Sequence, residues 1–276
     1  MSTLTITASD VNKLRLQTGA GMMDCKKALQ EANGDFEAAV DYLRKKGQKV
    51  AANRSDRDAK EGLVLAKTTA DNKRAAIIVL NCETDFVAKN EDFGKFANSI
   101  LDVAINNNPA TADELLALDL NGLKVSERIL EQVGKIGEKL EISTYQVINA
   151  EKVVAYNHPG NRVATIVGFN KIADDQVARD VAMQVAAMAP VAVDKNDVDS
   201  STIERELDIA REVIRAEGKP EDMVEKIAQG KLNKFYKDST LLNQEFIKDA
   251  KLTVAQYLDK SEKGLTVTSF KRAALS

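Results

Sequence analysis

Few residue types in this sequence could carry out chemistry. The 276 residues include one histidine and two cysteines. A zinc site with several histidines is therefore impossible, and Cys25 and Cys82 are too far apart in the chain for a Cys-x-x-Cys metal or redox motif. Two isolated thiols indicate buried, apolar side chains in a reducing cytoplasm.

The common enzyme motifs are also absent. Residues 19–24 begin like a dinucleotide-binding fingerprint, but Asp24 replaces the third glycine and no strand precedes the motif. No Gly-Lys pair is followed by Ser or Thr, so the sequence lacks a phosphate-binding loop. A catalytic triad would have to use His158, which lies in a polar turn, where a lone histidine usually faces solvent or a partner. We therefore expect no enzymatic activity and no cofactor.

Two short segments do carry unusual apolar residues. Met22 and Met23 open a helix after a Gly-Ala-Gly turn, so at least one should lie near the surface; they either fill a small core or form an adaptable contact for a partner. Phe86 lies in Thr84–Asn90, where a sheet edge leads into a helix. This phenylalanine is either a functional loop residue or a core anchor for the helix that follows.

The elements that position these segments begin with three short helices. Thr7 and Asp10 resemble a capping box, and Asn33-Gly34 signals the end of the second helix. Asp35 caps the third helix, which we expect to end at Gly47. These helices form a head at residues 1–50. A polar segment over 48–60 without periodicity predicts a linker, placed at 51–60.

Strand patterns follow the linker and predict an α+β fold. Residues 63–66 and 75–80 flank a turn at 71–72, and an amphipathic helix follows at 93–104. The plan recurs with strands at 152–156 and 163–169 around the turn 158–161. We therefore predict a two-module core, with an N-terminal module at 61–150 and a C-terminal module at 151–276. A short helix near 254–258 and a strand at 265–270 would complete the second module.

A different pattern interrupts the second module. Ile203, Leu207, Ala210 and Ile214 are spaced by four, three and four residues, which is typical of a helical hairpin or coiled-coil seam. Gly218 lies between this apolar stripe and a second apolar stripe of similar helical spacing. The spacing predicts a projecting antiparallel helical-hairpin insertion at about 200–236.

The composition limits the possible partners. Apolar residues make up 44% of the chain and charged residues 29%, and the formal net charge is −3. This balance does not indicate direct binding to nucleic acid. No stretch approaches the roughly 18 uninterrupted apolar residues of a membrane helix, and the N-terminus lacks the apolar core of a signal peptide. We expect a cytoplasmic protein that does not enter a membrane.

Two segments resemble the signatures of bacterial elongation factor Ts. The first comprises Leu14-Arg15, Thr18–Leu29 and Glu31–Asp35, and the second is Asn81–Ala88. The order of a three-helix head, linker, two α+β modules and helical hairpin is similar to that family over the whole chain. The family also has a hairpin residue pair that matches His158 and Arg162, although Asn161 and Ala164 stand where the family has glycine.

The resemblance implies a guanine nucleotide exchange factor for elongation factor Tu, the GTPase that carries aminoacyl-tRNA. The head would resemble a ubiquitin-associated fold and contact the GTPase through Met22 and Met23. Asp85 and Phe86 would form a wedge beside a GTPase helix, disturbing its magnesium and phosphate site. The partner-binding residues implied in addition are Thr84, Val87, Ile136, Gly137, His158 and Arg162, with Ile136 and Gly137 inside a further contact segment, Lys135–Glu138. A C-terminal module found in some members is expected to be absent, since the chain ends six residues after Phe270.

Two other classes of function are compatible with the residues alone. One is a non-catalytic adaptor whose head binds a ubiquitin-like partner. The other is a small-ligand enzyme with its site in the second α+β module. Neither would release GDP from a GTPase, so a nucleotide release assay distinguishes both from an exchange factor.

Overall fold

The computed structural model describes residues 6–275. Contacts divide the chain into two compact units. The first comprises Met1–Leu65, Ile78–Tyr145 and Ala274–Ser276, and the second comprises Ala66–Ile77 and Gln146–Ala273. Among the described residues, no helix is long and apolar enough to cross a membrane.

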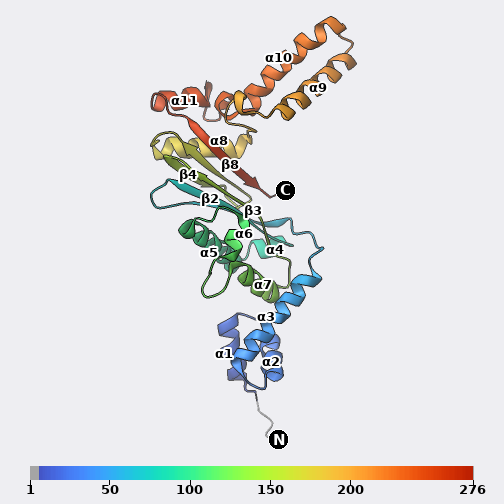
Figure 1. Ribbon diagram of the computed structural model, residues 1–276, viewed down its shortest axis with the longest axis vertical. Coiled ribbons are helices and arrows are strands. Elements are labelled where there is room, and N and C mark those ends of the chain that lie inside the picture. Colours follow the sequence, from blue (N-terminus) through green and yellow to red (C-terminus); the bar gives the residue numbers. More distant parts are fainter. Residues whose placement is uncertain (1–5, 276) are drawn as a thin grey trace. The chain divides into compact units, whose positions relative to one another are not determined.

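The first unit begins with three helices: α1 (Ala8–Thr18), α2 (Met22–Glu31) and α3 (Phe36–Asn53) (Figure 1). The capping box of Thr7 and Asp10 is confirmed, as is the cap on Asp35, whose side chain accepts a hydrogen bond from the amide of Ala38. These caps satisfy amide groups that the first helical turn leaves unpaired. The helices enclose a small core that contains Val11, Leu14, Cys25, Ala28, Leu29 and Ala39.

The expected end of α3 at Gly47 is wrong, because the helix continues to Asn53. Gly47 instead faces Gly134 on α7 (Val125–Ile136). A Cβ atom at Gly47 would lie 2.7 Å from the carbonyl oxygen of Leu130, and one at Gly134 would lie 2.8 Å from the Cα atom of Gly47. Glycine here permits close approach of two backbones, not a helix end. The first part of the expected linker is therefore helical.

A three-stranded sheet has the order β1 (Glu61–Thr68), β2 (Arg74–Cys82), β3 (Glu141–Asn149). The predicted β1–β2 hairpin is confirmed, and its turn contains Asn72 with a φ of 53°. The sequence did not predict β3. Its residues are mostly half-buried and mixed in polarity, so they produce neither a clean alternation nor an apolar run.

Four helices of the first unit follow β2 along the chain: α4 (Asp85–Ala88), α5 (Glu91–Asn107), α6 (Ala112–Ala117) and α7. The predicted apolar stripe of α5 is buried at Phe93, Ala97, Ile100, Leu101 and Ala104. Thr111 caps α6 by accepting a hydrogen bond from the amide of Glu114. The short helix α4 buries none of its residues.

The second unit contains the sheet β4 (Lys152–Asn157), β5 (Val163–Phe169), β8 (Val267–Ala274). Strands β4 and β5 are antiparallel, with Tyr156 opposite Thr165, and α8 (Asp175–Met188) packs against both. The remaining elements are η1 (Lys195–Asp197), η2 (Leu241–Asn243), β6 (Glu245–Phe246), β7 (Asp249–Thr253) and α11 (Val254–Ser261). The strand expected at 265–270 starts later and runs longer, and the pair β6–β7 was not predicted.

The helical hairpin consists of α9 (Ser200–Ala216) and α10 (Glu221–Ser239), which lie side by side (Figure 1). Its core contains Ala210, Ile214, Val224 and Ala228. Gly218 adopts a φ of 75° in the turn between the helices, a conformation that glycine adopts without steric cost. Arg211 pairs with Glu225 and Arg215 with Glu221 across the outer face. The predicted seam is confirmed at Ala210 and Ile214, and Leu207 packs against this core while partly buried. Ile203 is half-buried but is not part of the hairpin core.

Candidate functional site

The turn after β2 presents Phe86 to solvent. Thr84 is the N-cap of α4, and its hydroxyl accepts a hydrogen bond from the amide of Val87. Phe86 therefore lies in the first helical turn, where 83% of it is exposed. The alternative that Phe86 anchors the core is therefore wrong; Phe93 of the following helix, which is 3% exposed, is buried there.

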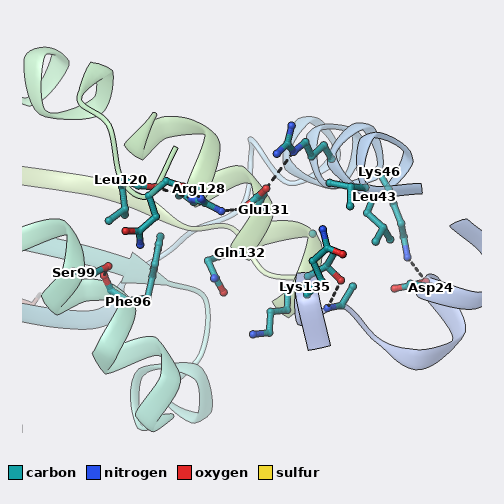
Figure 2. A pocket seen from close by; sticks show the side chains of 17 residues that line it. Asp24, Leu43, Lys46, Phe96, Ser99, Leu120, Arg128, Glu131, Gln132 and Lys135 are labelled. Atoms are coloured by element: carbon teal, nitrogen blue, oxygen red, sulfur yellow. Dashed lines mark hydrogen bonds and ion pairs between the residues drawn. The ribbon is translucent and has the colours of Figure 1, made fainter. Parts of the chain in front are cut away.

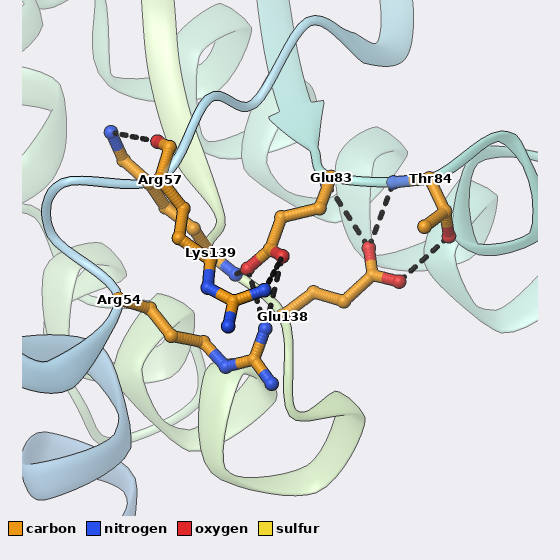
Figure 3. A network of polar contacts seen from close by, with 6 residues as sticks. All are labelled: Arg54, Arg57, Glu83, Thr84, Glu138 and Lys139. Atoms are coloured by element: carbon orange, nitrogen blue, oxygen red, sulfur yellow. Dashed lines mark hydrogen bonds and ion pairs between the residues drawn. The ribbon is translucent and has the colours of Figure 1, made fainter.

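A carboxylate from a distant segment holds this turn. The Oε2 atom of Glu138 accepts hydrogen bonds from the amides of Glu83 and Thr84, both at 3.0 Å. Its Oε1 atom accepts a 2.7 Å hydrogen bond from the hydroxyl of Thr84 (Figure 3). Three charge-assisted hydrogen bonds thus converge on one side chain, and such bonds are stronger than those between neutral groups.

Glu83 makes the reciprocal contact. Its Oε1 atom accepts a hydrogen bond from the amide of Lys139 at 2.7 Å, and the guanidinium of Arg54 donates to both oxygens at 2.8 and 2.9 Å. Arg57 lies 3.5 Å away at the rim of the cluster (Figure 3). Burial acts to raise the pKa of Glu83, but the bonds from Lys139 and Arg54 outweigh it, so that the pKa is lowered.

Two further side chains of the turn complete its surface. Asp85 pairs with Lys89 one helical turn later, with 2.6 Å between Oδ2 and Nζ. The hydrogen bond from Lys89 lowers the pKa of Asp85. Val87 is half-buried. The turn thus exposes an apolar ring next to a carboxylate.

The head exposes a second apolar surface. Met22 is 58% exposed and Met23 is 73% exposed, so the alternative that both fill the head core is wrong. Leu16 on α1 is 78% exposed and was not singled out by the sequence. The helical spacing of α1 could have indicated it, because Leu16 lies off the stripe of Val11 and Leu14.

A polar cavity of about 410 Å³ lies between the head helices, α5 and α7 of the same unit. Figure 2 shows ion pairs among several of its charged side chains. Lys46 lies 2.5 Å from Asp24, and Arg128 lies 2.9 Å from Glu131. Both carboxylates of the lining are thus paired with basic side chains, and Lys135 also lines the cavity.

The remaining candidates lie on two other segments. Ile136 ends α7, and Gly137 caps that helix with a φ of 79°, directly before Glu138. In the second unit, His158 and Arg162 are both exposed at the β4–β5 turn. The Nδ1 atom of His158 lies 3.1 Å from the hydroxyl of Tyr156. The prediction that His158 faces outward from a turn is confirmed.

The described residues contain no group of three or more His, Cys, Asp or Glu side chains that could hold a metal ion. Cys25 and Cys82 are buried and free, as expected. Burial raises the pKa of the Cys82 thiol to about 12, which keeps it protonated and unreactive.

Comparison with known proteins identifies the family. A family model described as Elongation factor TS matches residues 83–276. A curated protein named Elongation factor Ts from Flavobacterium psychrophilum is 54% identical over 273 residues, which cover 98% of this chain and 99% of the relative. Proteins of the same name from Christiangramia forsetii and Cytophaga hutchinsonii are 51% and 53% identical, covering at least 98% of each chain. This chain belongs to the elongation factor Ts family.

Membership of the elongation factor Ts family makes this chain a translation elongation factor. The matched segment starts at Glu83, so it contains the exposed turn and both segments around Gly137 and His158. Met22 and Met23 precede that segment. Sequence reasoning did not find the parts played by Glu83, Arg54 and Glu138. These residues contact partners that are 26 or more residues away in the sequence, and no local pattern marks such contacts.

Proposed function

We propose that this protein is a guanine nucleotide exchange factor that promotes GDP release from elongation factor Tu, acting by binding and not as an enzyme. The observation that carries the proposal is the exposure of Phe86 on a turn held by seven hydrogen bonds through Glu83 and Glu138. A large apolar ring in water is unfavourable by about 1.5–3 kcal/mol relative to a buried one, which a partner would recover.

The mechanism requires differential binding and no proton transfer. A factor that binds the nucleotide-free GTPase more tightly than the GDP-bound form must weaken GDP binding by the same factor. Phe86 and Asp85 would enter beside a helix of the GTPase and displace the groups around its magnesium and phosphates. Loss of the magnesium ion removes a large local positive charge that holds the diphosphate.

The other candidate residues would provide affinity around this wedge. Met22 and Met23 are flexible apolar side chains that adapt to a partner surface. Thr84 and Val87 flank the wedge, and Ile136 and Gly137 adjoin the segment that holds it. His158 and Arg162 would contact another domain of the GTPase. The head would correspond to a ubiquitin-associated fold and α9–α10 to a short coiled coil, in a cytoplasmic factor.

The decisive measurement is the release of labelled GDP from elongation factor Tu, with and without substoichiometric amounts of this protein. An exchange factor accelerates release and turns over, so a small amount empties a larger pool of GTPase. A non-catalytic adaptor, the alternative function, would leave the release rate unchanged at any concentration. That result would contradict the proposal.

A further inference from the structure

We propose that Glu138 and Glu83 are positioning residues that hold the Asp85–Phe86 turn in the orientation needed for exchange. The inference rests on the proposed function and extends it to residues that do not themselves enter the partner. Each carboxylate binds the backbone of the segment that carries the other one. Glu138 accepts from the amides of residues 83 and 84, and Glu83 accepts from the amide of residue 139.

The turn needs this support because it has little of its own. Helix α4 has four residues and buries none of them. A helix of one turn is unstable in isolation, since its nucleation cost is not offset by further hydrogen bonds. Without Glu138, the amides of Glu83 and Thr84 would lose their acceptor, and the direction of the Phe86 side chain would no longer be defined.

Glu138 is unsuited to a direct contact with a partner. Both of its oxygen atoms accept hydrogen bonds within the chain, three in total. A partner that bound this carboxylate would have to break bonds that orient the turn. This geometry places Glu138 behind the contact surface, in contrast to the exposed Phe86.

The same cluster connects the turn to α3. Arg54 is the C-cap residue of α3 and donates to both oxygens of Glu83, whose side chain is 12% exposed. The last helix of the head, α3, is therefore joined at its C-terminal end to Glu83, the carboxylate that supports the turn. Arg57 is more exposed and more distant at 3.5 Å, so we expect Arg54→Ala to impair exchange more than Arg57→Ala.

The test uses full-length Glu138→Ala, Glu138→Gln and Phe86→Ala, and the double variant of Glu138→Ala with Phe86→Ala. GDP release from elongation factor Tu is measured across a range of factor concentrations, with the melting temperature of each variant. Glutamine can accept from both amides through its oxygen and donate to Thr84 through its nitrogen, so it preserves the geometry without the charge. Glu141→Ala is the matched control, because Glu141 pairs with Lys139 but does not touch the turn.

We expect Glu138→Ala to lower the maximal release rate by about 10-fold, since small misplacements of an acting group are costly. The half-saturating concentration should change by less than about 2-fold, because the other contact surfaces are intact. Glu138→Gln should restore most of the rate and Glu141→Ala should behave like the wild type. The double variant should be no slower than the slower single variant, because both changes remove the same interaction.

Several outcomes would overturn the inference while leaving the proposed function in place. One is an unchanged release rate in Glu138→Ala. Another is a double variant whose loss is the product of the single losses, which would assign Glu138 an independent contact. A third is a Glu138→Gln variant as slow as Glu138→Ala, because the hydrogen-bond geometry that glutamine preserves would then not account for the rate.

Two further results complete the test. If Glu138→Ala does not fold, Thr84→Val removes the hydroxyl that binds Glu138 and should lower the maximal rate in the same way; an unchanged rate would overturn the inference. If the wild type does not release GDP, the proposed function fails and the inference fails with it.

Discussion

At the scale of single residues, the contrast between Phe86 and Phe93 separates contact from packing. Phe93 lies in the buried stripe of α5 and Phe86 lies in the first turn of α4, seven residues earlier. Both are aromatic residues near a helix N-terminus. Thr84 caps α4, whose first turn leaves Phe86 exposed, whereas Phe93 belongs to the buried stripe of α5. Truncation of the two rings should therefore affect different properties.

Phe86→Ala should keep the fold and lose most exchange activity. An exposed side chain contributes little to folding, so the free energy of unfolding should change by less than about 0.5 kcal/mol. GDP release should slow by about 10-fold or more, as expected for an aromatic hot spot. Melting temperature and release rate on one purified variant provide both values.

Ile172→Ala is the control for this substitution, because Ile172 is 76% exposed but lies outside every proposed contact. Its exchange rate should equal that of the wild type. A different result would contradict the assignment of Phe86 as the wedge: a Phe86→Ala variant that loses several kcal/mol of stability while each folded molecule still promotes GDP release at the wild-type rate.

Glu83 should make stability depend on pH in the acid range. Its pKa in the folded protein is below the ordinary value of 4.5, so its stabilising effect is fully present above that value. The effect is lost as the pH falls through the lowered pKa, when the carboxylate becomes protonated. The wild type should thus melt above Glu83→Gln at neutral pH, and the two melting temperatures should converge as the pH falls below the lowered pKa of Glu83. A constant difference at all pH values would contradict this origin of the stability.

At the scale of secondary structure, the crossing of α3 and α7 depends on two glycines. The backbones approach so closely at Gly47 and Gly134 that neither position has room for a Cβ atom. Elsewhere a glycine inside a helix lowers stability relative to alanine by about 1 kcal/mol. Here the close packing compensates for that cost, and Arg44 of α3 adds an ion pair with Glu131 of α7.

Gly134→Ala should therefore destabilise the protein although alanine favours the helix. Overpacking at a close contact costs about 1–3 kcal/mol, which exceeds the gain in helix propensity. Gly94→Ala is the matched control, since Gly94 is also inside a helix of this unit but has nothing within 4 Å of the added atom. Gly94→Ala should raise the melting temperature. If both variants are stabilised, the crossing is not as tight as described.

At the scale of the whole molecule, separate cores predict separate responses to damage. The α9–α10 hairpin has a core of its own around Ile214, distinct from the core of the second unit that includes Phe169 and Leu258. A structure divided in this way opens locally, because few contacts connect one cooperative segment with the next. The hairpin should then unfold without the sheet of its unit.

Ile214→Ala should accelerate amide hydrogen exchange in α9 and α10 but not in α8 and β5. Ile214 is fully buried, so its truncation should reduce the local opening free energy by about 2–5 kcal/mol. Ile209→Ala is the control, because Ile209 is on the same helix and 49% exposed. Equal loss of protection in β5 would show that the hairpin and the sheet unfold together.

The sequence by itself determined the features that arise from neighbouring residues. Caps such as Thr7 and Asp35 act on amides three residues away, and the stripe of α5 follows from helical spacing. The apolar spacing on either side of Gly218 likewise predicted the helical hairpin. The resemblance to the elongation factor Ts family also rests on short segments of neighbouring residues. Such features need no knowledge of what packs against them.

Only the tertiary structure decided the features that arise between distant residues. Helix α3 passes through Gly47 because Gly134 lies against it, and β3 forms because β2 offers it a partner. Glu83 and Glu138 are 55 residues apart, and their meeting determines how the Phe86 turn is held. Local sequence specifies which conformations a segment prefers, but contacts across the fold select among them, because the free energy of burial and hydrogen bonding exceeds local propensity.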